Sequence, residues 1–159
     1  MGVGIREARS ALDFEYVRRL RNANRGFLTG DARRIGLLRQ LRFWLRRPAS
    51  IDLYVAELDG RRCGYLLLRR DGDTTWITEV VDARHRGRGV AQAMIRFAAA
   101  RRPHLSAEIL SANEASLRLH ARAGFERVGA ADGRERHVLA IPTNVHAMPS
   151  LERRKAEAA

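Results

Sequence analysis

The sequence predicts an α/β (α+β) domain built around a mixed, largely antiparallel sheet. Two observations lead to this prediction. Apolar and β-branched segments separated by short glycine-containing turns fill the middle of the chain, and helix-forming segments with apolar faces stand before and after them. The length of 159 residues suits one domain. The order of the segments indicates six to seven strands and about four helices.

The N-terminal third is expected to hold one strand and two helices. Residues 2–8 favour a short strand, and residues 10–21 favour a helix that begins at a capping serine. Residues 22–30 are expected to form a loop. Residues 31–47 begin with an aspartate and carry several leucine and aromatic side chains, so they predict a second helix that Pro48 ends.

Three strands are expected next, joined as a meander. Residues 53–58 and 63–68 flank an Asp-Gly pair, which is a strong hairpin signal. A second Asp-Gly turn leads to a third strand over 74–81. This part of the sheet is therefore predicted to be antiparallel.

Helices and strands alternate in the second half of the chain. We expect helices over 90–102 and 113–123, a strand over 105–110, and a closing hairpin from 125–128 and 136–141. Pro103 and Gly124 end the two helices. We expect residues 1–142 to form a single domain and residues 143–159 to be a poorly ordered C-terminal tail.

The charge of the chain argues against nucleic-acid binding. The formal net charge is +12, and all but one of the 30 basic residues are arginine. These arginines are spread along the chain and only 6% of the residues are aromatic, so nothing indicates a concentrated nucleic-acid surface. A field of this sign still attracts anionic ligands and disfavours a polycationic acceptor.

Other features indicate a cytoplasmic protein without a metal. No apolar run approaches the roughly 18 residues that cross a bilayer, and the N-terminus lacks the layout of a signal peptide. The single cysteine, Cys63, allows no internal disulfide, and the 5 histidines lack metal-ligand spacing. We expect neither a membrane span nor a metal site.

A turn rich in arginine and glycine is the most informative feature of the chain. It connects the strand over 74–81 to the helix over 90–102, and it consists of Arg86, Gly87, Arg88, Gly89, Val90 and Ala91. The free N–H groups and the positive dipole end of a helix N-terminus bind phosphate. The chain lacks GxxxxGK[ST] and GxGxxG, which excludes a nucleoside-triphosphate P-loop and disfavours a dinucleotide-binding turn. The turn predicts a phosphate or pyrophosphate site.

A second motif follows around the helix over 113–123. It contains Asn113, Ser116, His120 and the Gly124-Phe125 pair. Together with the R-x-x-G-x-A turn, at this separation, it resembles the GNAT acyl-CoA N-acyltransferase superfamily. His120 stands where the family pattern usually has a tyrosine. The resemblance covers residues 52–141 and implies the GNAT fold, whose sheet is splayed where coenzyme A binds.

The resemblance implies acetyl-CoA as the cosubstrate. The arginine–glycine turn would hold the pyrophosphate, and the strand that contains Val80 and Val81 would pair with the pantetheine arm. A backbone N–H near Val81 would polarise the thioester carbonyl. Asn113 and Ser116 are expected to contact the coenzyme, although Asn113 also suits a helix N-cap.

Three residues are candidates for proton transfer. Glu79 lies on the expected coenzyme-binding strand, and Glu108 lies where bacterial protein N-terminal acetyltransferases of the superfamily carry a glutamate. Either is a candidate base, and either can instead pair with one of the many arginines. The tyrosine that His120 replaces commonly protonates the leaving thiolate. An imidazole can do the same, or it can serve as a packing residue.

The amine acceptor is the least determined part of the reaction. Asn22, Arg25 and Phe27 are candidates to line its pocket, with ordinary helix and loop roles as the alternative. The resemblance implies an acetyl-CoA-dependent N-acetyltransferase acting on a primary amine of a small molecule, with aminosugars and nucleotide-linked aminosugars among the candidates. A protein N-terminal or lysine acetyltransferase and a catalytically silent coenzyme A-binding module are the alternatives. The family also leaves a homodimer open.

Overall fold

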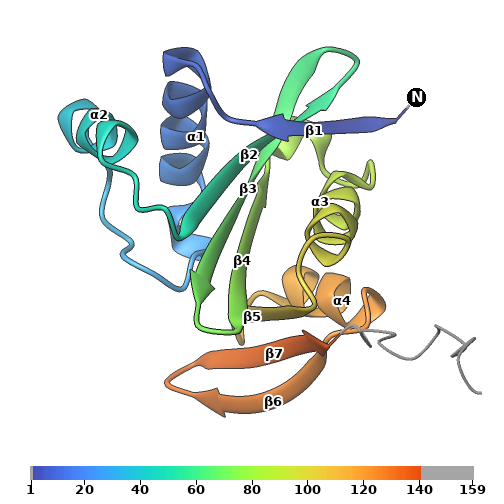
Figure 1. The fold of residues 1–159 in the computed structure, drawn as a ribbon. Coiled ribbons are helices and arrows are strands. Elements are labelled where there is room, and N and C mark those ends of the chain that lie inside the picture. The colour runs from blue at the N-terminus through green and yellow to red at the C-terminus, as the bar shows by residue number, and fades with distance from the viewer. Residues whose placement is uncertain (1, 141–159) are drawn as a thin grey trace, which may run out of the picture.

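A single seven-stranded sheet organises the computed structural model, which describes residues 2–140 (Figure 1). Its strands are β1 Val3–Glu7, β2 Ile51–Leu58, β3 Arg61–Asp71, β4 Thr74–Val81, β5 His104–Leu110, β6 Glu126–Ala131 and β7 Arg134–Ala140. They lie in the order β1-β2-β3-β4-β5-β7-β6. All neighbouring pairs are antiparallel except β4 and β5, which are parallel. The predicted mixed, largely antiparallel sheet is confirmed.

Four α-helices cover the two faces of this sheet. They are α1 Ala11–Ala23, α2 Leu37–Leu45, α3 Val90–Ala99 and α4 Glu114–Arg122, and two short 3-10 turns are η1 Arg25–Phe27 and η2 Ala83–His85. In Figure 1, α1 and α2 lie on one side of the central strands and α3 lies on the other. None of the described helices is long and apolar enough to cross a membrane.

Apolar side chains form a separate core on each face. Ile77 of β4 packs with Met94 of α3 in one core, whereas Val80 of β4 and Tyr65 of β3 pack with Phe14 of α1 in the other. Successive residues of a strand point to opposite faces. On β4, Ile77 therefore faces α3 and Val80 faces α1.

Polar contacts hold the start of α1 against two strands. Ser10 and Asp13 form a capping box, in which each side chain accepts a hydrogen bond from the backbone N–H of the other. Asp13 also accepts hydrogen bonds from Arg6 of β1 and Arg62 of β3, each at 2.9 Å. The bonds from Arg6 contribute most to holding the pKa of Asp13 well below its usual range. The helix start is thereby fixed to β1 and β3.

The second helix is shorter than predicted. The sequence predicts a helix over 31–47, but α2 has only 9 residues. Side chains of α1 bind the backbone of the segment before it. The carbonyl of Ile35 accepts hydrogen bonds from Arg18 and Asn22, and Arg21 donates to two further carbonyls of this segment. Because contacts with α1 satisfy these carbonyls, the segment stays irregular.

The remaining predicted elements are confirmed, with shifts at their ends. The third strand over 74–81 has the predicted bounds, whereas β3 extends beyond the predicted 63–68 at both ends. The helix predicted over 90–102 ends earlier, at Ala99. The predicted domain end at 142 and the tail over 143–159 lie outside the described residues.

Candidate active site

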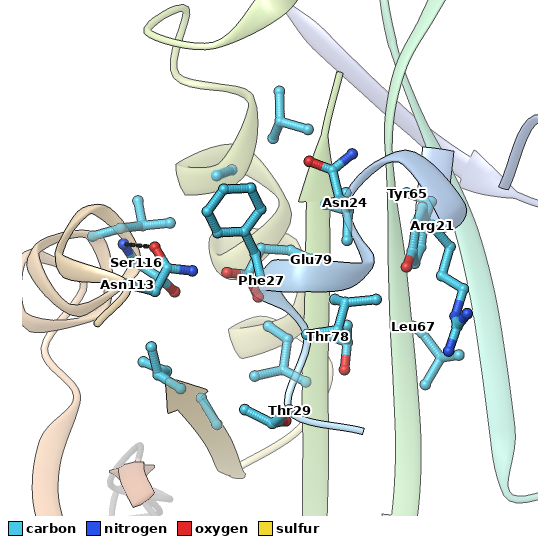
Figure 2. A pocket seen from close by; sticks show the side chains of 18 of the residues that line it. Arg21, Asn24, Phe27, Thr29, Tyr65, Leu67, Thr78, Glu79, Asn113 and Ser116 are labelled. Carbon is cyan, nitrogen blue, oxygen red and sulfur yellow. Dashed lines mark hydrogen bonds between the residues drawn. The ribbon is translucent and has the colours of Figure 1, made fainter. Parts of the chain in front are cut away.

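A cleft opens where β4 and β5 separate. The two parallel strands pair only at Thr75 with Leu105 and at Trp76 with Ser106. Beyond these pairs the strands diverge, and a cleft of about 950 Å³ reaches both of them. Its other walls come from the end of α1, from η1 and α2, from the start of α3 and from α4, and Figure 2 shows part of this lining. The backbone edge of β4 is thus free to pair with an extended ligand.

Backbone N–H groups are available at the start of α3. Gly87 and Gly89 have φ angles of +74° and +75°, which glycine adopts without strain. Gly89 is the N-cap of α3 and has no side chain to bind the first-turn N–H groups. Both glycines line the cleft together with Val90 and Ala91. With the positive end of the helix dipole, these N–H groups suit a phosphate.

The arginines around this turn have different surroundings. Arg86 lines the cleft and donates a hydrogen bond of 2.7 Å to Oδ1 of Asn24, at the end of α1. Arg84 pairs with Asp82 at 2.7 Å and lowers the pKa of Asp82 to about 2. Arg88 is not among the cleft-lining residues. The turn is therefore tied to α1 through Arg86.

Glu79 and His120 form a buried pair beside the cleft. Their side chains are 8% and 2% exposed, and Oε1 of Glu79 lies 3.6 Å from Nε2 of His120. Burial raises the pKa of Glu79, and the charge of His120 opposes part of that rise. Nδ1 of His120 lies 2.9 Å from the carbonyl oxygen of Ser116, so it donates a hydrogen bond there. Nε2 is left facing Glu79, an arrangement that suits proton exchange between the two side chains.

The two candidate glutamates line the cleft from opposite faces of the sheet. Strand alternation from Ile77 turns Glu79 toward the α3 face, where His120 of α4 meets it. Glu108 on β5 is next to Ile109, a residue of the same core, so it points to the α1 face. Its side chain is 39% exposed, and Oε1 lies 3.4 Å from Nη1 of Arg134.

The start of α4 contributes two of the predicted residues. Asn113 and Ser116 both line the cleft. Asn113 is also the N-cap of α4, because its Oδ1 accepts a hydrogen bond of 3.2 Å from the backbone N–H of Ser116. Its amide NH₂ group has no protein partner among residues 2–140, which leaves it for a ligand.

Some of the residues predicted to contact coenzyme A or the acceptor line the cleft, and others do not. Val80 and Val81 line the cleft, and so does Phe27 of η1, which is 57% exposed. Asn22 and Arg25 are not among the cleft-lining residues. Asn22 instead exchanges two hydrogen bonds with the backbone of the segment before α2.

Three further cleft residues were missed by the sequence prediction. Arg21, Tyr65 and Thr78 line the cleft on its α1 side, as Figure 2 shows. Tyr65 and Thr78 are on paired strands at positions that share a face, a relation that appears only once the register is known. Arg21 resembles any exposed helix arginine in sequence. Within residues 2–140 no group of three or more His, Cys, Asp and Glu side chains is placed to hold a metal ion.

The comparisons with known proteins agree with this geometry. Residues 15–125 match the profile described as Acetyltransferase (GNAT) family. No curated protein matches the chain by sequence. Solved structures with the same fold include a spermidine N-acetyltransferase from Vibrio cholerae in complex with CoA and spermine, with a TM-score of 0.74 and 14% identity over 87% of this chain and 95% of that chain.

Two further structures extend this comparison. A putative acetyltransferase from Salmonella typhimurium with its cofactor acetyl-CoA has a TM-score of 0.67 and 22% identity over 95% of this chain and 99% of that chain. A ribosomal-protein-alanine N-acetyltransferase from Brucella melitensis has a TM-score of 0.69 and 22% identity, covering 87% and 99%. At these identities the likeness concerns the fold.

Proposed function

Because the chain belongs to the acetyltransferase (GNAT) family and is an acetyl-CoA-dependent acyltransferase, we propose that it acetylates a primary amine of a small molecule. The amine attacks the thioester directly. The observation that carries this proposal is the separation of β4 from β5, which opens one cleft to the α3 N-terminus and to the α1 side of the sheet. A thioester in that gap is accessible to an amine from the α1 side.

The placement of acetyl-CoA is supported by groups along the cleft. The pyrophosphate binds at the N–H groups of residues 87–91, where glycine backbone and the α3 dipole attract it. The pantetheine arm pairs with the free edge of β4 at Val80 and Val81. Asn113 offers its amide NH₂ group from α4.

Glu79 is the proposed base. An ammonium has no free electron pair, so the acceptor must lose a proton before its nitrogen attacks the thioester carbon. Glu79 lines the cleft from the α3 side, so it takes that proton through water in the gap between β4 and β5, and its raised pKa makes it a better acceptor than an exposed carboxylate. The carbon–nitrogen bond forms and the carbon–sulfur bond breaks. Of the two protons that the ammonium loses, one reaches the thiolate through the Glu79–His120 pair and one goes to solvent.

Thiol release tests the proposal. The protein is incubated with acetyl-CoA and a panel of nucleotide-linked aminosugars, amino acids, polyamines and peptides, with an amine-free blank for hydrolysis. We expect release with at least one small amine and a rise in Tm with acetyl-CoA. Release with peptides alone indicates a protein acetyltransferase. A rise in Tm without release from any amine indicates a silent coenzyme-binding module.

A further inference from the structure

The arginines on the α1 side of the cleft differ in their partners. Arg18 pairs with Glu15 at 2.7 Å, and Arg39 pairs with Asp31 at 3.2 Å. Arg21 lines the same part of the cleft. Among residues 2–140 its guanidinium bonds only to backbone carbonyls and meets no carboxylate.

The structure holds Arg21 in place without neutralising it. Its guanidinium donates to the carbonyls of Asp31 and Arg33, in the segment between α1 and α2. Carbonyl dipoles fix a guanidinium but carry no net charge, and two of its five N–H donors account for these bonds. Figure 2 shows the side chain of Arg21 near Tyr65 and Leu67 of β3. Donors therefore remain for an anion in the cleft.

Tyr65 lines the cleft on β3, the strand next to β4. Burial raises the pKa of Tyr65, Arg21 lowers it, and Glu79 raises it further, so both charges act on this hydroxyl. Tyr65 pairs with Val80 on the strand that lines the β4–β5 gap. Neighbouring strands lie about 4.8 Å apart, so a small molecule can reach from Arg21 to that gap.

We propose that the acceptor is a small amine that also carries a carboxylate or phosphoryl group, and that Arg21 binds this anionic group. The inference deepens the proposed function and rests on it. The anionic end lies beneath α1 at Arg21, and the amine end lies in the gap between β4 and β5. A planar guanidinium binds either anion through paired hydrogen bonds. A polyamine brings further positive charge to Arg21, so it is a poor acceptor.

Matched pairs of amines test this inference. Thiol release from acetyl-CoA is measured with leucine and leucinamide, γ-aminobutyrate and its amide, and glucosamine 6-phosphate and glucosamine, with spermidine as the polycation. We expect kcat/KM for at least one anionic member to exceed that of its neutral partner by about tenfold or more. The pair that shows the preference distinguishes carboxylate from phosphoryl recognition.

Variants assign the preference to Arg21. Arg21→Gln should reduce the ratio of kcat/KM for the anionic amine to kcat/KM for its neutral partner about tenfold or more. Arg21→Lys keeps the charge, so it should retain part of the ratio even if the segment before α2 shifts. Arg96→Gln, on the exposed face of α3, removes the same charge away from the cleft and should leave the ratio unchanged.

Several results would overturn the inference while leaving the proposed function intact. They are equal or better turnover of every neutral partner, a preference for spermidine, and a ratio that Arg21→Gln leaves unchanged or that Arg96→Gln lowers equally. Absence of thiol release from every amine would contradict the proposed function itself, and the inference with it.

Discussion

Glu79 differs from the other carboxylates of the cleft in its surroundings. It is almost fully buried, and the titratable group beside it is the His120 imidazole rather than an arginine. Desolvation disfavours its ionised form, which explains the raised pKa. Glu108 is more exposed and lies beside Arg134. The sequence offers both glutamates as candidate bases, but their surroundings indicate different roles.

Substituting each glutamate separates these roles. We expect Glu79→Gln to lower kcat by about 100-fold or more, with little change in the KM for acetyl-CoA. The base form of Glu79 is needed, so wild-type kcat/KM should rise with pH above the usual carboxylate range, and the variant should lose this rise. Glu108→Gln is the matched control and should lower kcat by less than about tenfold. Equal losses in both variants, or an unchanged pH profile in Glu79→Gln, would contradict the assignment.

His120 has a separate prediction. We expect His120→Ala to lower turnover by about tenfold, more than it lowers acetyl-CoA affinity. Its charge opposes the raised pKa of Glu79, so removing it should move the acid limb of the pH–rate profile to higher pH. Steady-state rates across pH test this, with His104→Ala, exposed on β5, as the control. Unchanged turnover with the true acceptor would refute a catalytic role.

At the scale of elements, Asp13 joins α1 to β1 and β3. We expect Asp13→Asn to lower the free energy of unfolding by about 3 kcal/mol, because Arg62 then loses its charge partner and Arg6 keeps only Glu57. Urea unfolding at pH 7 measures this. Glu114→Gln, in an exposed pair with Arg118, is the control and should change it by less than about 0.5 kcal/mol.

The pH dependence gives a second measurement on the same variant. The pKa of Asp13 is lowered in the folded state, so its contribution to stability is present above its unfolded pKa of about 3.9 and is lost as the pH falls below that value. The stability difference between wild type and Asp13→Asn should therefore shrink in acid. A difference that is constant between pH 7 and pH 3 would show that the carboxylate charge does not hold the helix.

Local signals were enough to predict most elements but not the segment before α2. Turn residues, alternation and a capping serine mark the strands and α1 in the sequence. The sequence predicts a helix over 31–47 because the apolar periodicity of this segment is real. The backbone of its first part instead bonds to Arg18, Arg21 and Asn22, and these contacts join positions more than nine residues apart, which no local pattern reveals. Asn22 is bound to that backbone, whereas Asn24 lines the cleft.

The sequence predicted individual residues of the site but not the contacts between distant ones. The turn over 86–91 and the start of α4 each lie within one motif, and the structure places five of the six turn residues at the cleft. The contact of Glu79 with His120 joins positions 41 residues apart, and that of Arg86 with Asn24 joins positions 62 apart. No local pattern encodes such pairs, because the sheet and α4 bring them together.

At the scale of the whole molecule, the net charge of +12 acts on a polyanionic coenzyme. A field of this sign raises the encounter rate of acetyl-CoA with the cleft. Dissolved salt screens this field, because the Debye length falls from about 30 Å at 0.01 M to about 8 Å at 0.15 M. We therefore expect kcat/KM for acetyl-CoA, at saturating acceptor, to fall severalfold over that range while kcat stays nearly constant. Initial rates of thiol release measure both. Arg96→Gln is the control and should weaken the salt dependence only slightly, because it removes one charge from an excess of +12 spread over the chain. A parallel fall in kcat would show that salt alters the reacting site rather than the approach of the coenzyme.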